Sequence, residues 1–185
     1  MNKRKLLTLM GGAKTPWYLA NKTIPSANLL EYVELPAAGK LYAGAAVASG
    51  QPWTVAVKTT TYVPAATSYF LFDSATGRIV IGIGNATSYG INNGTIWTNA
   101  PLYPDTNVHI IFIVSNGANI QEYLDNTAVG SNNASNKGIG GATRWRSDNS
   151  SASTNVWTNS VPKGAVYNIA LSEAQRNALY ATMLP

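Results

Sequence analysis

The sequence predicts an all-β fold, an antiparallel β-sandwich with a short C-terminal helix. Charged residues make up only 11% of the 185 residues and apolar residues 45%, whereas a typical domain has about 25% charged residues. Asn, Ser and Thr must therefore provide most of the polar surface. From Trp53 onward apolar residues alternate with a period of two, which is typical of half-buried strands. Polar turns separate these strands, and only the last segment resembles a helix.

The part of the chain before Trp53 carries weaker signals. LLEYVELP (residues 29–36) is expected to form an edge strand, and AAGKLYAGAAVASG (residues 37–50) a loop or an irregular strand. Prolines at positions 16, 25, 36 and 52 exclude a long helix here.

Three segments then predict strands of the sandwich. WTVAVK (53–58) places Trp53, Val55 and Val57 on one face. YFLFDSATGRIVIGIG (69–84) predicts a hairpin with its turn from Asp73 to Gly77 and with Ile79, Ile81 and Ile83 on one face of its second strand. VHIIFIV (108–114) is apolar on both faces, which predicts a central strand covered on both sides.

The rest of the chain predicts a second hairpin, a loop and the closing elements. NIQEYLDNTAVG (119–130) has its turn at Asp125 and Asn126, and residues 131–155 are expected to form one long polar loop. AVYNIAL (165–171) is the last predicted strand. Ser172 and Gln175 then form a capping box that opens a helix to about Met183, with Leu179, Met183 and Leu184 pressed onto the body.

The net charge of +5 belongs to the first 22 residues. Five of the 13 basic residues precede Thr23, and the remaining eight balance the eight acidic residues of the chain. The sequence therefore predicts a basic N-terminal arm (1–22) and one β-sandwich domain (23–185). No nucleic-acid groove, membrane span or secretory signal is expected. The arm is expected to dock on a partner protein through Lys3, Arg4, Lys5, Lys14 and Trp17.

Composition narrows the possible chemistry. The chain has no Cys and a single His, which excludes disulfides, thiol nucleophiles, Cys-ligated metals and two-His metal sites. His109 lies within a predicted strand and is expected to be packed or hydrogen-bonded there. No metal site is predicted. Calcium is weakly supported, because it takes six to eight oxygen ligands and the acids occur one per turn, at Asp73, Asp105, Asp125 and Asp148.

Several segments together resemble a known family. The apolar strand Val108–Ile111, the hairpin Glu122–Asn126 and the closing strand and helix from Val166 through Ser172 are similar to the corresponding segments of the laminin-G-like, concanavalin A-like jelly roll. The likeness covers about residues 50–184. The opening, MNKRKLLTLMGGAKTPWYLA, resembles the start of small bacteriophage or prophage virion proteins that carry this jelly roll behind a short arm.

An enzyme of this fold class would resemble the glucanases, whose paired carboxylates alternate along one strand. Retaining enzymes of this kind need two carboxyl groups about 5 Å apart. Glu31 and Glu34 are separated by an odd number of residues, so a strand directs them to opposite faces. Glu122 and Asp125 are also separated by an odd number of residues, so they too would point to opposite faces of a strand. The sequence therefore predicts no enzyme activity.

Sugar binding is the small-ligand chemistry that the composition favours. Aromatic faces stack on sugar rings, while Asn, Asp and Arg satisfy the hydroxyls. Trp145 between Arg144 and Arg146 is the leading candidate, and Tyr89, Asn92, Asn93 and Trp97 form a second cluster. The alternative, that Trp145 caps the end of the sandwich or packs in a subunit interface, has more weight, since aromatic residues and Arg also anchor protein interfaces.

The charge asymmetry and the resemblance together predict a non-enzymatic structural protein of a bacteriophage virion, made in the bacterial host cytoplasm. The jelly roll would be displayed on the particle, either as a tail-tip or tail-fibre module that binds host-surface glycan or as a capsid decoration protein. Other virion proteins would be its partners, and a homo-oligomer is expected. The alternative is a free lectin-like carbohydrate-binding protein.

Overall fold

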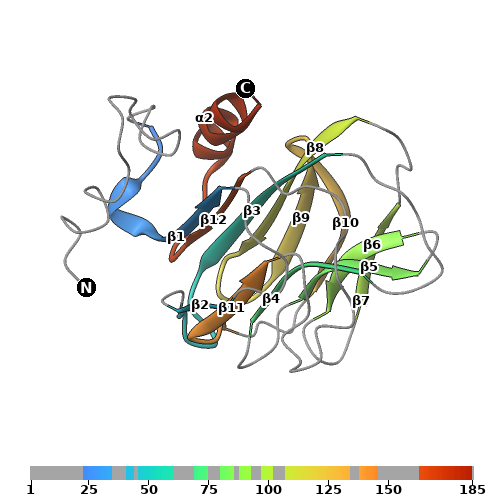
Figure 1. Cartoon of the computed structure of the whole chain (residues 1–185), viewed down its shortest axis with the longest axis horizontal. Helices are drawn as coiled ribbons and strands as arrows, with labels where there is room; N and C mark the ends of the chain where they lie inside the picture. The colour runs from blue at the N-terminus through green and yellow to red at the C-terminus, as the bar shows by residue number, and fades with distance from the viewer. Residues whose placement is uncertain are drawn as a thin grey trace.

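The computed structural model describes residues 23–34, 41–43, 46–60, 69–74, 80–85, 88–92, 97–101, 107–133, 138–145 and 163–184. Within these ranges the chain forms two six-stranded antiparallel sheets, a short 3-10 helix η2 (Ser26–Asn28) and the helix α2 (Glu173–Met183) near the C-terminus (Figure 1). The predicted all-β sandwich with a C-terminal helix is confirmed. The predicted arm, residues 1–22, lies outside the described residues.

Each sheet combines strands from distant parts of the sequence. Sheet A has the order β1 (Leu29–Glu34), β12 (Lys163–Tyr167), β3 (Trp53–Thr60), β8 (Val108–Ser115), β9 (Ile120–Leu124) and β10 (Thr127–Asn133). Sheet B has the order β2 (Leu41–Ala43), β11 (Ala142–Trp145), β4 (Tyr69–Ser74), β5 (Val80–Asn85), β6 (Ser88–Asn92) and β7 (Trp97–Pro101). The sheet faces that meet each other are called inner here, and the opposite ones outer.

The inner faces enclose the main core. Trp53, Val55 and Val57 of β3 alternate into it as predicted, together with apolar residues of sheet B such as Phe72. Burying such side chains stabilises the fold by about 25 cal/mol per Å² of apolar surface removed from water. This core joins the two sheets into one sandwich.

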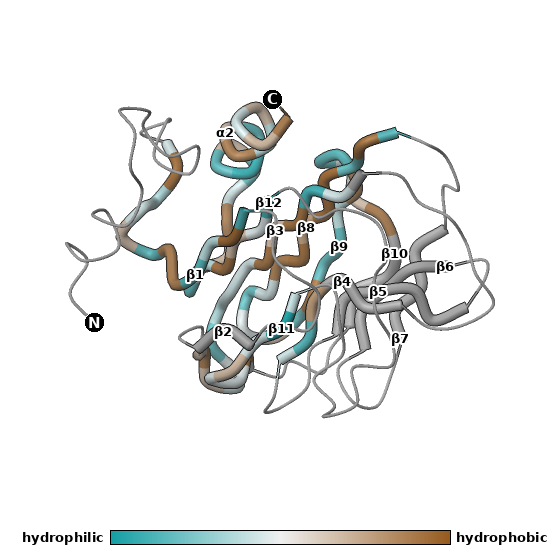
Figure 2. Tube along the Cα trace, viewed as in Figure 1, coloured by the Kyte–Doolittle hydropathy of each residue, from teal (hydrophilic) through white to brown (hydrophobic). Residues whose placement is uncertain are grey.

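A second core lies on the outer face of sheet A, under α2. Ile110 and Phe112 of β8 face it, and Leu179 and Met183 of the helix are fully buried against it. The neighbours Ile111 and Ile113 face the inner core. Strand β8 is therefore apolar on both faces, as predicted, and Figure 2 shows it as one of the most apolar stretches of the trace.

The hairpin from β9 to β10 turns at the residues predicted from sequence. Asp125 and Asn126 have φ angles of 47° and 63°, and Leu124 pairs with Thr127 across the turn. A two-residue turn with both φ angles positive matches the twist of the flanking strands, and Asn and Asp tolerate this conformation. The Asp125 carboxylate accepts hydrogen bonds from the Ile110 amide (2.9 Å) and lies 2.7 Å from Nδ1 of His109. The expectation of a hydrogen-bonded His109 is confirmed.

Helix α2 begins at the predicted capping box. The Ser172 hydroxyl accepts from the Gln175 amide, and the Gln175 side chain accepts from the Ser172 amide at 2.8 Å. At the other end, Nζ of Lys58 donates to the Leu184 carbonyl at 2.5 Å and Nζ of Lys163 to the Thr182 carbonyl at 3.1 Å. Positively charged groups near a helix C-terminus interact favourably with the helix dipole and stabilise the helix. Leu184, expected to press on the body, is instead 44% exposed.

Several predicted boundaries are wrong. Residues 131–155 are not one loop, because β10 continues to Asn133 and β11 occupies Ala142–Trp145. The last strand is β12, Lys163–Tyr167, and not residues 165–171. Asp73 lies on β4 and not in a turn. Among the described residues, no helix is long and apolar enough to cross a membrane.

Candidate functional site

Strand β11 carries the leading sequence candidate, Trp145, but directs it inward. The side chain is fully buried and meets the Phe72 ring edge-on, with ring centroids 4.9 Å apart. Because β11 is a strand and not part of a polar loop, residue 145 points into the inner core. The prediction that Trp145 stacks on a sugar is therefore corrected: its ring is a core residue of the sandwich.

The indole of Trp145 takes part in a polar contact between the two sheets. Its Nε1 donates to Oε1 of Glu31 on β1 at 2.5 Å, and the Thr143 hydroxyl lies 2.9 Å and 2.8 Å from the two oxygens of the same carboxylate. Burial raises the pKa of Glu31, while the hydrogen bonds from Trp145 and Thr143 oppose that rise. Glu31 thus connects an edge strand of sheet A to β11 of sheet B.

A second buried carboxylate, Glu122, lies on the same inner face of sheet A. It is 1% exposed and sits in a cross-strand row with Ile113, Val55, Val166 and Glu31. Four strand spacings of roughly 4.8 Å, about 19 Å, separate the two acids. Paired glycosidase carboxylates lie within about 10 Å of each other. Glu31 and Glu122 therefore cannot act as such a pair.

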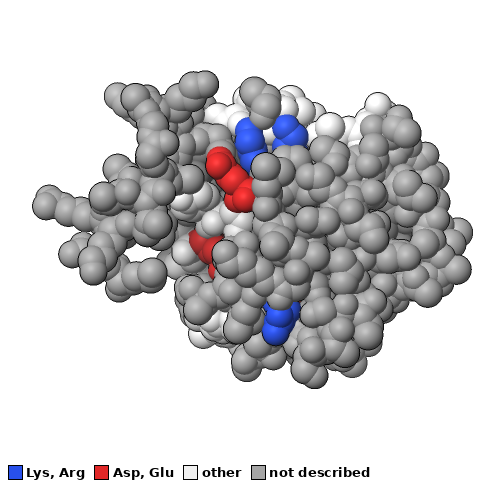
Figure 3. Space-filling model, viewed as in Figure 1, with Lys and Arg blue, Asp and Glu red and all other residues white. Residues whose placement is uncertain are grey.

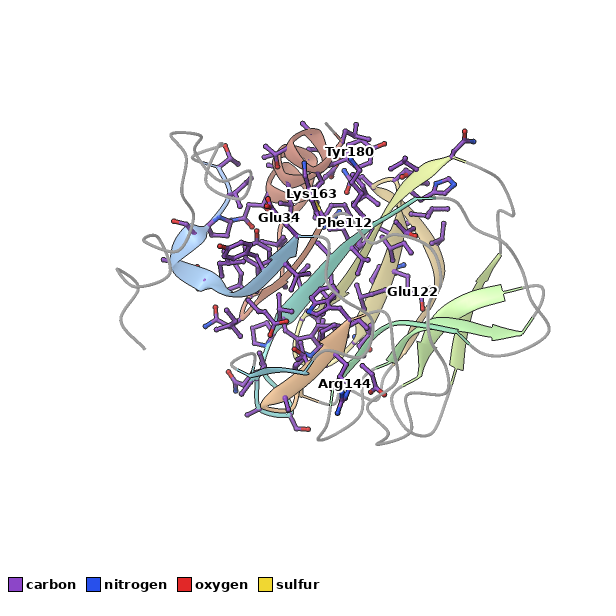
Figure 4. All side chains as sticks on the ribbon, in the orientation of Figure 1. Glu34, Phe112, Glu122, Arg144, Lys163 and Tyr180 are labelled. Carbon is purple, nitrogen blue, oxygen red and sulfur yellow. The ribbon has the colours of Figure 1, made fainter. Side chains whose placement is uncertain are left out.

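Arg144, the neighbour of Trp145, lies on the opposite face of β11. Thr143 and Trp145 face inward, so alternation places Arg144 on the outer face of sheet B. Its side chain is half-buried, and Figure 4 shows it leaving β11 on the side away from sheet A. Arg144 pairs in register with Asp73 of β4, which is fully buried. The sequence candidate that faces outward is therefore the arginine.

The strand register brings one residue of the first predicted cluster, Arg144, into line with two of the second, Asn92 and Trp97. Arg144 pairs with Asp73, Asp73 with Val80, Val80 with Asn92 and Asn92 with Trp97. These five residues form a single row across β11, β4, β5, β6 and β7 on the outer face of sheet B. We call them the outer row. By residue type the row contains Arg, Asp, Asn and Trp, the types that the sequence analysis associated with saccharide binding.

A glycine pair borders the outer row. Gly82 of β5 pairs with Gly90 of β6, two residues along from Val80 and Asn92, so both belong to the same outer face. Glycine within a strand commonly marks a place where a ligand or another backbone approaches closely. Asn99 of β7 pairs with Gly90 and adds a further amide position beside this pair.

The other predicted site residues divide into two groups. Tyr89 lies on β6 but is three residues from Asn92, so it belongs to the inner face of sheet B and not to the outer row. Arg146, Asn93 and the arm residues Lys3, Arg4, Lys5, Lys14 and Trp17 lie outside the described residues. Asp73 and Asn99 were missed as site residues, because only strand register brings them to the row and its border.

Charge on the described surface is separated into two places. Figure 3 shows basic side chains beside α2 and again at the opposite end of the molecule, with acidic side chains nearer the first group. Lys163 and Glu34 belong to the α2 end and Arg144 to the other (Figure 4). Burial lowers the pKa of Lys58 and of Lys163, and the charge of Lys163 adds to the effect on Lys58. The described residues contain no cluster of three or more His, Asp or Glu that could hold a metal ion.

No family model matches the chain, and no curated protein matches it. Solved structures of sialidases do match. Trypanosoma rangeli sialidase in complex with 2,3-difluorosialic acid has a TM-score of 0.64 at 11% identity, covering 86% of this chain and 34% of that chain. A mutant of the NanB sialidase from Streptococcus pneumoniae has a TM-score of 0.60 at 15% identity, covering 85% of this chain and 28% of that one.

These similarities are those of fold. The chain spans about a third of the length of the sialidase chains it matches. With a TM-score of 0.64 over 86% of this chain, the aligned part of the sialidase has a similar fold. The structural neighbours are enzymes, but at such low identity their activity does not carry over. The expectation that this chain is not an enzyme stays a prediction.

Proposed function

We propose that this chain is a non-enzymatic carbohydrate-binding β-sandwich module that binds its ligand on the outer face of sheet B. The observation that carries the proposal is the register from Arg144 through Asp73 and Asn92 to Trp97. Arg144 of the first cluster and Asn92 and Trp97 of the second, which the sequence separates by about fifty residues, hold positions in one register row of sheet B. A sheet face with residues of these types suits an elongated polar ligand.

The structural neighbours support a link to carbohydrates. Two of the matching sialidase structures contain sialic acid or a fluorinated derivative of it, so folds of this shape occur in proteins that act on sugars. We further propose that the sandwich is a jelly roll of the laminin-G-like, concanavalin A-like kind. The pairing of the first described strand β1 with the last strand β12 supports this assignment.

We also propose that the module is displayed on a bacteriophage particle and docked by its basic N-terminal arm. The support is the sequence alone: five basic residues and no acidic one precede Thr23, and the opening resembles that of phage virion proteins. A neutral body behind a basic arm suits a displayed domain whose attachment and recognition surfaces are separate. A homo-oligomer belongs to the same proposal.

A glycan array probed with the full chain tests the carbohydrate proposal. Binding to a defined group of glycans supports it, and no binding to any glycan overturns it. A parallel assay with a fluorogenic sialoside tests the non-enzymatic part. Hydrolysis above a heat-denatured control would overturn that part and favour a sialidase-like enzyme.

Gold labelling of phage particles with antibody against residues 23–185 tests the virion proposal. Label at the tail end supports host-glycan binding on the particle, while label over the shell favours a capsid decoration protein. Protein that remains free in the lysate, with no label on any particle, overturns the virion role and favours a free lectin-like protein.

A further inference from the structure

The turn that joins β8 to β9 contains the dipeptide Asn116–Gly117. The two strands end at the pair Ser115 and Ile120, and the Asn116 amide donates to the Asn119 carbonyl at 3.1 Å across the turn. The Asn116 residue is exposed. The dipeptide therefore lies where water reaches it, while the strands on both sides hold the backbone around it.

The turn requires both residues of the dipeptide. Gly117 has a φ of 96°, a conformation that glycine adopts far more readily than other residues, and a Cβ there would lie 2.6 Å from the carbonyl oxygen of Gly50. Oδ1 of Asn116 accepts hydrogen bonds from the amides of Ala118 (2.9 Å) and Asn119 (2.8 Å). The fold thus selects Asn followed by Gly at these positions.

The same contacts favour a reaction between the Asn116 side chain and the next amide. A five-membered ring closes when the Gly117 nitrogen attacks Cγ of Asn116, and the missing side chain leaves this nitrogen unhindered. The negative charge that develops on Oδ1 is stabilised by the amides of Ala118 and Asn119, as in an oxyanion hole. The Gly117 N–H donates to Oγ of Ser115 at 3.2 Å, which draws the proton away from the attacking nitrogen.

We propose that Asn116 is a site of spontaneous covalent modification, at which asparagine converts to aspartate and isoaspartate through a succinimide. The Gly117 nitrogen gives up its proton and bonds to Cγ, the bond from Cγ to Nδ2 breaks, and Nδ2 takes up a proton and leaves as ammonia. One water molecule then opens the ring at either of its carbonyls. Ser115 acts as a positioning residue for the proton of Gly117.

The modification introduces a charge where the neighbouring loops have none. Residues 46–52 and 138–141, which include Gly50 beside the turn, contain no charged residue. A carboxylate at position 116 can accept the same two amide hydrogen bonds, so the turn accommodates the aspartate product. Isoaspartate lengthens the backbone by one carbon and would disturb the bond from Asn116 to Asn119. This inference is independent of the proposed carbohydrate binding.

Mass spectrometry of peptides from the full chain, incubated in mildly alkaline buffer, follows the loss of ammonia and gain of water at each asparagine. We expect Asn116 to react at least about tenfold faster than the exposed Asn107 and Asn168, which precede the β-branched residues Val108 and Ile169. The folded chain should also react at Asn116 at least as fast as the chain in urea, where the donors to Oδ1 are lost. Equal loss at the three asparagines, or slower loss in the folded chain than in urea, overturns the proposal.

Variants test the contribution of the turn. Ser115→Ala should slow the reaction at Asn116 by about threefold, the equivalent of one ordinary hydrogen bond, and should have no effect in urea. Ser49→Ala is the matched control, because its hydroxyl also accepts a loop amide, that of Gly138 at 3.3 Å. Equal rates in the two folded variants, or the same slowing in urea, overturn the role of Ser115. Asn116→Asp supplies the reference peptide that distinguishes the aspartate product from isoaspartate.

Discussion

Trp145 of sheet B packs so closely on Gly164 of sheet A that a Cβ at position 164 would lie 2.4 Å from Cζ3 of the indole and 2.6 Å from its Cη2. Real Cβ atoms do not approach other atoms so closely. The glycine on β12 is therefore what allows the largest inner-core side chain of β11 to lie between the sheets. Together with the hydrogen bond from the same indole to Glu31, this contact fixes the spacing of the sandwich at that edge.

Gly164→Ala should destabilise the protein by about 1–3 kcal/mol, the usual cost of overpacking a core. Because Cζ3 and Cη2 belong to the six-membered ring of the indole, Trp145→Phe removes both atoms. The double variant should therefore be less destabilised than the sum of the single variants. Urea denaturation measures all three. Gly141→Ala is the control, since nothing lies within 4 Å of a Cβ there, and strict additivity in the cycle would contradict the contact.

Glu31→Gln should change how stability depends on pH. Burial raises the folded-state pKa of Glu31, so the protonated form is favoured by folding. Its contribution to stability is fully present below the ordinary pKa of Glu and is lost as the pH rises through the raised value. The wild type should thus lose stability relative to the Gln variant across that window. Denaturation at a series of pH values measures this, and a difference between the two proteins that stays constant across the window would contradict it.

Ser172→Ala should cost about 1 kcal/mol, because it removes the hydroxyl that caps the amide of Gln175. Gln175→Ala should cost less, since it removes only the reciprocal bond to the Ser172 amide. Thermal unfolding followed by circular dichroism checks both values, with the exposed Ser26→Ala as the control. A loss at Ser172 no larger than at Ser26 would show that the capping box adds nothing to stability.

Arg176→Gln should loosen the contact between α2 and the β9–β10 hairpin. The guanidinium lies 3.8 Å from the centroid of the Tyr123 ring and donates to Oδ1 of Asn126 and to the Leu171 carbonyl, both at 3.0 Å. The variant loses the cation–π contact and the charge-assisted bonds, together about 2 kcal/mol. Hydrogen exchange of α2 amides should become faster, and unchanged exchange would contradict this role.

Strong local patterns predicted most of the fold. Strand β8, the turn at Asp125 and Asn126 and the capping box at Ser172 each depend on signals within a few residues, and each was predicted at its position. Strand β11 was missed because Ala142–Trp145 lies within a polar stretch rich in Gly, Ser and Asn. The inward direction of Trp145 is explained by its contacts with Phe72 and Glu31, which are distant in the sequence.

The candidate site shows the same limit. Sequence identified Arg144, Asn92 and Trp97 by residue type, but it placed them in two clusters and ranked Trp145 first. Which of two neighbouring residues faces outward depends on one residue of register. That the row is continuous depends on the order of strands within sheet B. Neither the face on which a residue lies nor the order of the strands can be predicted from the sequence without knowing which strands pair.

The central claim is that the outer row, and not the inner tryptophan, binds saccharide. The most direct measurement compares Trp97→Ala and Trp145→Phe for affinity toward the strongest glycan found on the array, in full chains shown to be folded. We predict at least about a tenfold loss for Trp97→Ala, a typical value for an aromatic residue that dominates a binding surface, and no change for Trp145→Phe beyond its effect on stability. Unchanged affinity for Trp97→Ala, or a comparable loss for Trp145→Phe, would contradict it.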